Sequence, residues 1–390
     1  MSYQKNMSNN WPTKKLGEVT KIEGGGTPST KNPLFWNGDV LWLTPKELSD
    51  FSGREIFDTE RKITSEGLKH SKLFPAGAVL FTSRAPIGYV AIAGIQMATN
   101  QGFKNFICNE KVLNNGFLYY FLKLKTKYLQ SLGRGATFTE ISRSILAKVD
   151  IPLPPLEIQK QIVERLDKIV AAQKLNDDLI QKANELFQSL LHKELNPAGR
   201  GWEMKKLAGI AETSSGGTPL KDKAEFYENG TIPWLRSGEV SRGLIFESEL
   251  FITEKGLKNS SAKIFPIDTV LVAMYGATAG QVGLLKFEAS TNQAICGILP
   301  NNKFISEYLY YFLKTQTKKL IQISTGGAQP NISQQIIRNI KIPLPDLKTQ
   351  KQIVAKLSAV QYYKTQLLAQ KSKLKELFNS VLAKSFNGQA

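Results

Sequence analysis

Cysteine and histidine are scarce in this chain of 390 residues, which has two of each. Cys108 and Cys296 are too few for a disulfide framework or a zinc site, and we interpret them as buried structural thiols. His70 and His192 are too few and too far apart for a metal centre or a catalytic triad. The sequence therefore predicts neither a metal site nor histidine-based catalysis.

Long apolar runs are also missing. No stretch approaches the roughly 18 apolar residues needed to span a bilayer, and the polar segment MSYQKNMSNNWPTKK lacks the apolar core of a signal peptide. Hydrophobic residues make up 42% and charged residues 22%, as is typical of a soluble globular protein. We expect a cytoplasmic protein whose length suits two to four domains.

Acidic residues are outnumbered by basic ones. Lys and Arg total 51 against 33 Asp and Glu, a formal net charge of +18. A protein this basic usually binds a polyanion, because neutralised phosphates release condensed counterions. An anionic membrane surface is the main rival partner, but no basic amphipathic helix supports it. The charge therefore favours nucleic acid.

The sequence repeats itself after about 190 residues. Four motifs recur in register: GGTP at 25–28 and 216–219, Thr-Asn-Gln at 99–101 and 291–293, LYYFLK at 118–123 and 309–314, and IPLP at 151–154 and 342–345. Trp11 is likewise matched by Trp202. The chain is therefore a tandem duplication.

Each repeat has two parts. The first is rich in Gly, Thr, Asn and aromatics, with short β-type runs such as AVLFTSR and TVLVAMYG around one helical segment. It predicts an α+β domain with a mixed or antiparallel sheet. The second part starts after prolines and contains no Pro or Gly until a clear stop, which predicts a long helix. The expected boundaries place α+β domains at 1–151 and 198–342, and helical regions at 152–197 and 343–390.

Apolar residues recur every seventh position in both helical parts. The recurring positions are Ile162, Ile169, Asn176, Ala183 and Leu190, and then Ile353, Val360, Leu367, Leu374 and Val381. One interpretation is that each stripe packs on its own domain. Antiparallel pairing of the two helices explains the length better, and the polar Asn176 would then set their register. In the second helix, Asp346 is expected to cap a start at Leu347.

Catalytic motifs are absent. Asn32-Pro33-Leu34-Phe35 only approaches the motif with which adenine methyltransferases hold a flipped base, and no Gly-x-Gly loop follows a strand. The glycines at 24–26 lack the Gly-Lys-Ser/Thr ending of a phosphate-binding loop. A faint nuclease pattern at Asp50 and 60–62 is not repeated in the second copy. The chain is therefore expected to have no catalytic activity.

The duplicated halves, each with GGTP, Asn-Gly followed by Trp-Leu, Thr-Asn-Gln and a closing IPLPPLEIQKQIV-like segment, resemble the specificity subunit of type I restriction-modification enzymes. The resemblance covers essentially the whole chain. It implies two target-recognition domains, each reading one half of a bipartite, asymmetric DNA sequence. It also implies an antiparallel coiled coil that holds these domains apart and docks the modification subunits.

The resemblance implies that methylation and cleavage of DNA are carried out by other subunits. The partners implied are double-stranded DNA, two modification (methyltransferase) subunits and the restriction (ATP-dependent translocase and nuclease) subunits, with no membrane. S-adenosylmethionine, ATP and Mg would be bound by those subunits, and this chain would hold no cofactor. A helix of about 40 residues is roughly 60 Å long and would span on the order of 17 base pairs.

DNA contacts are expected in loops that differ between the two copies, although surface loops also drift without a role. The candidate residues are Thr44, Lys46, Arg84, Asn100, Gln101, Arg134, Thr137, Arg236, Tyr275, Asn292, Gln293 and Gln329. Arg84, Arg134 and Arg236 are preferred, because arginine can bind guanine with two hydrogen bonds. The retained Thr-Asn-Gln motifs serve either loop hydrogen bonding, which we favour, or a phosphate contact.

Docking of modification subunits is expected on exposed helix faces, for which a solvated surface is the alternative. The candidate residues are Gln159, Lys160, Gln161, Gln350, Lys351 and Gln352. Two rival functions stay open at this point. One is a self-sufficient methyltransferase or nuclease, and the other is a non-catalytic coiled-coil scaffold or RNA-binding protein.

Overall fold

The computed structural model describes residues 11–84, 86–133, 140–324 and 331–387. The chain forms two compact units, Met1–Asp177 with Ala369–Ala390, and Asp178–Leu368. Each unit combines one α+β domain with the parts of both long helices that pack on it. The boundaries expected between recognition domains and helical regions stay a prediction, because this division groups domain and helix together.

The first unit is built around two mixed sheets. The larger has the strand order β2 (Thr20–Gly24), β10 (Lys104–Cys108), β7 (Val79–Phe81), β8 (Val90–Ala93) and β4 (Glu55–Ile56). The smaller has the order β5 (Lys62–Ile63), β3 (Trp36–Leu43), β9 (Met97–Thr99) and β6 (Leu73–Phe74). One pair in each sheet is parallel, β4 with β8 and β3 with β9. The predicted mixed sheet is confirmed.

The second unit repeats this topology. Its larger sheet has the order β13 (Thr213–Ser215), β21 (Ile295–Ile298), β18 (Val270–Ala273), β19 (Val282–Leu285) and β15 (Leu244–Ile245). Its smaller sheet has the order β16 (Phe251–Ile252), β14 (Ile232–Leu235), β20 (Ala289–Thr291) and β17 (Ile264–Phe265). The parallel pairs are again β15 with β19 and β14 with β20.

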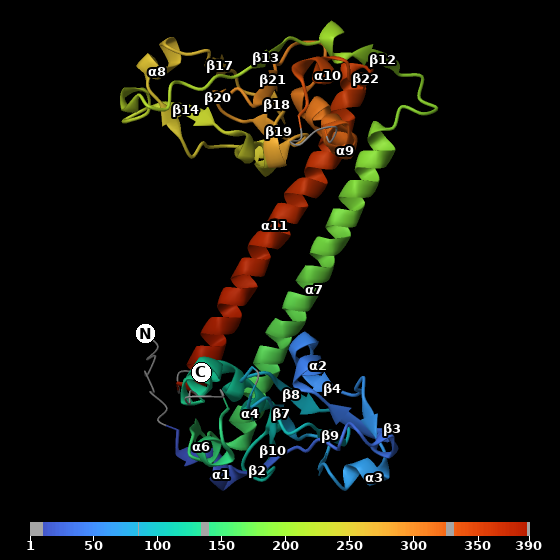
Figure 1. The fold of residues 1–390 in the computed structure, drawn as a ribbon, viewed down its shortest axis with the longest axis vertical. Helices are drawn as coiled ribbons and strands as arrows, with labels where there is room; N and C mark the ends of the chain where they lie inside the picture. Colours follow the sequence, from blue (N-terminus) through green and yellow to red (C-terminus); the bar gives the residue numbers. More distant parts are fainter. Residues whose placement is uncertain (1–10, 85, 134–139, 325–330, 388–390) are drawn as a thin grey trace, which may run out of the picture. The chain divides into compact units, whose positions relative to one another are not determined.

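The larger sheet is buried on both faces, which explains why its strands are continuously apolar. In β7, Val79 and Phe81 pack in the core with helix α4 (Asn115–Leu124), whereas Leu80 between them packs in the core with the smaller sheet. Successive side chains of a strand point to opposite faces. Each domain therefore has three layers, a helix, a five-stranded sheet and a four-stranded sheet, and α4 lies beside β7 and β8 (Figure 1).

A two-stranded ribbon closes each domain and leads into its long helix. In the first unit β1 (Thr13–Lys15) pairs with β11 (Asp150–Pro152), and in the second β12 (Glu203–Lys206) pairs with β22 (Lys341–Leu344). The second strand of each ribbon carries the start of the repeated IPLP motif. The motif therefore marks the same exit from both domains.

The long helices are α7 (Leu156–Leu195) and α11 (Leu347–Phe386), each of 40 residues. The start of α11 at Leu347 agrees with the sequence analysis. Asp346 caps α11 as expected, since its carboxylate accepts a hydrogen bond from the Thr349 amide at 2.7 Å. These hydrogen bonds from backbone amides lower the pKa of the Asp346 carboxyl group.

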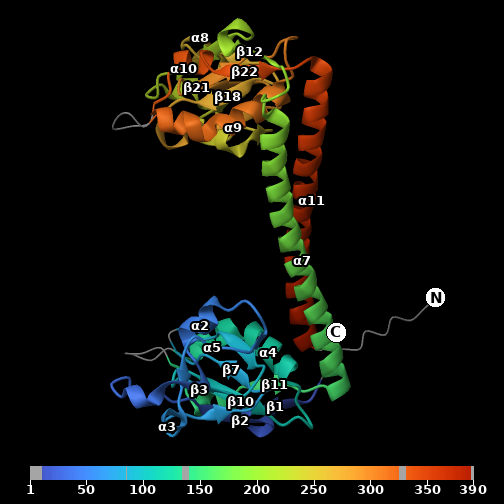
Figure 2. The same cartoon turned by 90° about the vertical axis from the view of Figure 1, so that its right-hand side faces the viewer.

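The two helices run side by side in opposite directions (Figures 1 and 2). In the first unit Asp177 pairs with Lys371 at 2.8 Å, and Gln173 donates to the carbonyl of Leu374 at 3.2 Å. In the second unit Glu194 pairs with Lys356 at 3.1 Å. The predicted antiparallel pairing is confirmed. Asn176 is buried in this seam, and its role in setting the register stays a prediction.

The rival interpretation, packing on the domains, also holds at the helix ends. In the first unit Ile162 and Leu166 of α7 share a core with Phe386 of α11 and the domain helix. In the second unit Leu191 of α7 and Ile353 of α11 do the same. Each domain is therefore seated on the start of its own helix and the end of the other.

Both cysteines are free thiols. Cys296 is fully buried, as expected, whereas Cys108 is only half-buried. Burial raises the pKa of both thiols to about 12, so neither is a reactive thiolate at neutral pH. Within the described ranges, no cluster of His, Cys, Asp or Glu could hold a metal ion. The helices described there are also too short or too polar to cross a membrane.

Candidate nucleic-acid interface

The motifs retained in both copies bind one another. In the first unit the Gly26 amide donates to the carbonyl of Thr99 at 2.9 Å, and the Thr27 hydroxyl donates to the side-chain oxygen of Gln101. The Trp42 indole then donates to the Gly26 carbonyl at 2.9 Å. Hydrogen bonds therefore join the GGTP, Trp-Leu and Thr-Asn-Gln motifs into one cluster between the two sheets.

The second unit has the same hydrogen-bonded cluster. The Gly217 amide donates to the Thr291 carbonyl at 2.9 Å, Thr218 donates to Gln293, and the Trp234 indole donates to the Gly217 carbonyl at 2.9 Å. The loop hydrogen bonding favoured for the Thr-Asn-Gln motifs is therefore present. A further phosphate contact by Asn100, Gln101, Asn292 or Gln293 stays a prediction.

The first glycine of each GGTP motif is required by close backbone approach. A Cβ atom on Gly25 would overlap the carbonyl oxygen of Thr99, and one on Gly216 would overlap that of Thr291. Neither glycine has a positive φ. Space between the two loops, rather than backbone conformation, therefore explains the motif.

A buried or half-buried glutamate holds the loop that follows the central strand of each smaller sheet. In the first unit Thr44 caps helix α2 (Pro45–Asp50), and its amide donates to Glu47 at 2.9 Å. The other carboxylate oxygen of Glu47 accepts from the Glu60 amide at 2.7 Å. Glu47 thus ties two loops together, while the neighbouring Lys46 is exposed.

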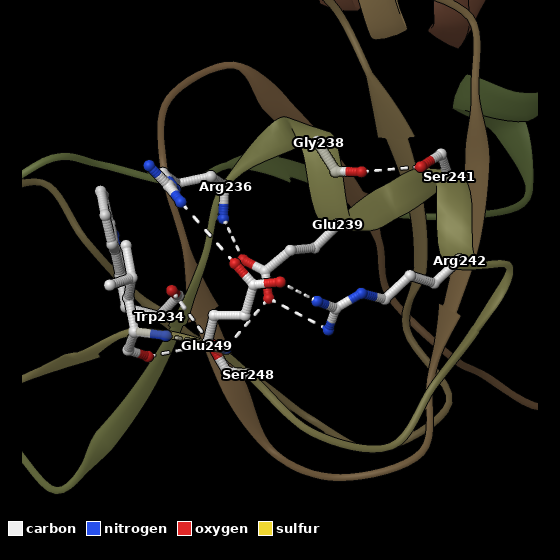
Figure 3. Close-up of polar contacts among 9 residues, drawn as sticks. Trp234, Arg236, Gly238, Glu239, Ser241, Arg242, Ser248 and Glu249 are labelled. Carbon is white, nitrogen blue, oxygen red and sulfur yellow. Dashed lines mark hydrogen bonds and ion pairs between the residues drawn. The ribbon is translucent and has the colours of Figure 1, made fainter. Parts of the chain in front are cut away.

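Glu239 does the same in the second unit, next to the short helix η4 (Ser237–Arg242). It accepts from the amide of Arg236 at 2.9 Å and from the amide of Glu249 at 3.1 Å (Figure 3). Sequence reasoning missed this glutamate pair. The signal was available, because Glu47 and Glu239 follow Leu43 and Leu235 at the same spacing in both copies.

The structure brings most candidate residues of the first unit to one edge. The Asn100 amide donates to the carbonyl of Leu43 at 3.0 Å, which places the Asn100–Gln101 turn beside Thr44. The Ser83 amide donates to Gly102 at 2.8 Å, which draws in the loop of Arg84. A Cβ on Gly102 would lie 3.5 Å from the Arg84 side chain. Thr44, Lys46, Arg84, Asn100 and Gln101 therefore share one surface.

The equivalent edge of the second unit is assembled in the same way. The Asn292 amide donates to Leu235 at 2.9 Å, and the Met274 amide donates to Ala294 at 2.8 Å. These bonds bring together Arg236, Tyr275, Asn292 and Gln293. Tyr275 is 41% exposed and the Arg236 side chain 57% exposed, so both can reach a ligand.

Arg84 is already near a carboxylate. Its guanidinium lies 3.9 Å from Glu140, which also pairs with Lys104 at 3.0 Å. Arg84 is therefore weakly held and partly exposed. Arg134, Thr137 and Gln329 lie outside the described residues.

Arg61 is a further exposed cation that sequence reasoning did not propose as a DNA contact. Its guanidinium stacks 3.9 Å from the centre of the Trp36 ring, an arrangement that fixes an arginine without neutralising it. No sequence signal marks it, because the ring comes from a strand more than twenty residues away.

Two docking predictions are wrong. Gln159 and Gln350 are fully buried rather than exposed. The Gln159 amide accepts from the Asn114 backbone at 2.8 Å and donates to two backbone carbonyls, of Val112 and Pro154. Gln350 makes the equivalent bonds to Ile305 and Pro345 in the second unit.

The reason is helical periodicity, since Gln159 lies one turn before Ile162 on the stripe that faces the domain. Both glutamines are internal hydrogen-bonding residues and are not available to a partner. Lys160, Gln161, Lys351 and Gln352 are exposed, and their role in docking stays a prediction.

Comparison with known proteins gives the family. The model of the type I restriction modification DNA specificity domain matches twice, at residues 8–185 and 199–376. The MjaIX specificity subunit of Methanocaldococcus jannaschii is 33% identical over 362 residues, covering 86% of this chain and 83% of that protein. The EcoR124I/EcoR124II specificity subunit of Escherichia coli is 28% identical over 261 residues, covering 63% of each.

Solved structures share the fold. The crystal structure of the type I restriction-modification S subunit from M. genitalium has a TM-score of 0.61 at 17% identity, covering 99% of this chain and 98% of that one. The HsdS subunit from Thermoanaerobacter tengcongensis has a TM-score of 0.57 at 20% identity, covering 100% and 99%.

The chain therefore belongs to the specificity-subunit family of type I restriction-modification systems, with two DNA specificity domains in tandem. Subunits of this family are the non-catalytic, DNA-recognising components of those systems. The family resemblance and the expectation of a non-enzyme are confirmed. Neither rival function is favoured.

Proposed function

We propose that each domain of this chain reads one half of a bipartite, asymmetric DNA target through the loop edge described above. The observation that carries the proposal is that one framework presents different side chains in the two units. Thr44 and Arg236 occupy the same place next to the retained glutamate, and Arg84 occupies the place of Tyr275. A shared framework with different readers suits two different half-sites.

The chemistry of these side chains suits the major groove. Arginine can bind guanine with two parallel hydrogen bonds, and asparagine and glutamine can bind adenine in the same way. Arg84 and Arg236 are the proposed guanine readers. Lys46, which is exposed, is proposed to bind a phosphate, which positions the domain without selecting sequence.

The remaining parts of the system are proposed from the family. Two modification subunits would dock on the paired helices, near Lys160, Gln161, Lys351 and Gln352. Restriction subunits would join that complex. S-adenosylmethionine, ATP and Mg would be bound by these partners, and the assembly would act in the cytoplasm. The paired helices of 40 residues each would set the spacing of the half-sites.

Methylation-sensitive sequencing of the source genome tests the proposal directly. The gene is compared intact and deleted, with the modification subunits expressed in both strains. We expect adenine methylation to disappear at one split, asymmetric motif, whose two halves identify both half-sites. Methylation that persists unchanged without the gene, or that disappears at an unsplit palindrome, would contradict the bipartite reading.

A further inference from the structure

Two arginines of the segment that follows β14, Arg236 and Arg242, share the carboxylate of Glu249 (Figure 3). Arg242 donates a hydrogen bond to it, and the guanidinium of Arg236 lies 3.7 Å away. The Glu249 side chain is 55% exposed and that of Arg236 57% exposed. The ion pair between Arg236 and Glu249 is therefore long and exposed to solvent, and it contributes little stabilising free energy. Arg236 can leave it readily.

Arg242 is held much more firmly than Arg236. It also pairs with Glu239 at 3.4 Å, and the Glu239 side chain is only 5% exposed. Glu239 in turn accepts the backbone amides of Arg236 and Glu249. Moving Arg242 away would leave a buried carboxylate without its cation, which is costly. The Arg242 side chain is therefore held in place, whereas the Arg236 side chain can move toward a ligand.

The first unit has the same backbone arrangement without the arginines. Glu60 stands where Glu249 stands, because its amide donates to Glu47 at 2.7 Å as that of Glu249 donates to Glu239 at 3.1 Å. Thr44 replaces Arg236 in this framework. Among the described residues no ion pair involves Glu60. Glu249 and Glu60 are therefore equivalent in backbone position but different in charge environment.

A carboxylate beside a mobile arginine changes which DNA group that arginine can use. A phosphate is an anion, so Glu249 repels it at the short distances of a phosphate clamp. The major-groove edge of guanine is uncharged and offers two acceptors to the arginine fork. Arginine has five donors, so Arg236 can bind guanine and still keep a contact with Glu249.

We infer that Glu249 is a specificity-determining residue, whose negative charge beside Arg236 repels phosphate, so that Arg236 reads a guanine base instead. The inference rests on the proposed function, since it requires this loop to contact DNA. It assigns Arg242 and Glu239 as positioning residues. It also predicts an asymmetry, because the first unit lacks this device.

The test measures binding of the full chain, co-purified with its modification subunits, to two duplexes over a series of salt concentrations. One duplex carries the methylated motif, and the other has the same length and composition in scrambled order. For Glu249→Gln we expect affinity for the scrambled duplex to rise about fivefold. The slope of log affinity against log salt on that duplex should steepen by about 0.9, as for one added phosphate contact. Affinity for the motif duplex should change less. The ratio of the affinity for the motif duplex to that for the scrambled duplex therefore falls.

Glu60→Gln is the matched control. It removes the same charge from the equivalent position of the other unit, where no ion pair of the described residues involves this glutamate. We expect it to leave both affinities and the salt slope essentially unchanged. An equal rise for Glu60→Gln and Glu249→Gln would show a general loss of negative charge and would overturn the inference.

The double variant Arg236→Ala/Glu249→Gln shows which arginine is released. If Glu249 acts through Arg236, the gain on scrambled DNA disappears when Arg236 is absent. A gain on scrambled DNA that persists in the double variant would overturn the inference. So would a Glu249→Gln variant that loses as much affinity for the motif as Arg236→Ala does, because Glu249 would then contact a base itself.

Arg236→Ala alone separates this inference from the proposed function. We expect it to weaken motif binding roughly 5- to 150-fold, the range of one bidentate base contact. If Arg236→Ala weakens motif binding but Glu249→Gln changes nothing, only the role of Glu249 fails. If Arg236→Ala changes nothing, this loop does not read DNA and both proposals for it fail.

Discussion

Gln159 shows how one side chain can hold a domain on its helix. Its amide satisfies one backbone donor and two backbone acceptors at the point where the chain leaves the domain and α7 begins. Gln350 occupies the same place in the second unit. Backbone groups inside a protein are costly when left unpaired, which explains why both copies have glutamine at this position.

We predict that Gln159→Ala lowers the free energy of unfolding by about 1–3 kcal/mol, because one buried and two partly buried backbone groups lose their partner. Chemical denaturation followed by circular dichroism measures the change. Gln161→Ala, two positions further on an exposed face, is the control and should shift stability by less than about 0.5 kcal/mol. Equal effects of the two variants would contradict the assigned role of Gln159.

The paired glycines of the GGTP motif offer a second test at this scale. Gly25→Ala places a methyl group against the Thr99 carbonyl, so we expect a loss of about 1–3 kcal/mol in unfolding free energy from steric overlap. At Gly24 the nearest atom to an added Cβ, the Phe103 carbonyl oxygen, is 3.8 Å away. Gly24→Ala should therefore be nearly neutral in thermal denaturation, and a loss as large as that of Gly25→Ala would rule out the steric explanation.

At the scale of elements, the two domains are fastened to their helices differently. In the first unit Asp167 of α7 accepts a hydrogen bond from the Tyr120 hydroxyl at 2.6 Å and pairs with Arg54 next to β4. Burial, and then the bond to Asp167, raise the pKa of Tyr120, which keeps its donor proton. In the second unit Tyr311 faces Ser358 at 3.3 Å instead. Only the first of these two contacts is charged.

We predict that Asp167→Asn lowers the unfolding free energy by about 1 kcal/mol, less than for a fully buried pair, because solvent reaches about a third of both charged side chains. The loss should shrink at high salt, since part of it is electrostatic. Glu164→Gln, which breaks an exposed pair with Lys168 one turn away, is the control and should have almost no effect. A salt-independent loss would show that packing, not charge, is responsible.

At the scale of the whole molecule, the duplication predicts that the two loop edges proposed to bind DNA can be altered separately. We expect Arg84→Ala to relax one half of the methylated motif and leave the other half unchanged, and Arg236→Ala to do the reverse. Methylation-sensitive sequencing of strains that carry each variant measures this. Loss of methylation at all sites in equal proportion would instead indicate phosphate contacts without base reading.

Much of this architecture could be predicted before any coordinates. Proline, glycine and capping residues act on their near neighbours, so the bounds of α7 and α11 follow from local sequence. A seven-residue apolar period requires a partner surface, which predicted the antiparallel pair. The strand-rich segments predicted the mixed sheet. The internal repeat predicted two equivalent units, because similar sequences fold alike.

The edge proposed to bind DNA was predictable only in part. Divergence between copies led to Arg84, Arg236 and Tyr275, which the fold indeed gathers at one edge of each unit. The spacing of Glu47 and Glu239 is repeated in both copies, but the sequence does not show that these glutamates also bind the amides of Glu60 and Glu249, which come from a different loop. Gln159 and Gln350 were misplaced because polarity suggested exposure, whereas backbone groups of another segment required them inside.

The duplication, the long helices and the family follow from the sequence alone, since these depend on local chemistry and on repetition along the chain. Which charged side chains meet depends on the folded chain. Arg236 and Arg242 share Glu249, while Glu60 stands in the same backbone position without them. Ion pairs of this kind depend on distances between loops, and those distances are set when the two sheets pack.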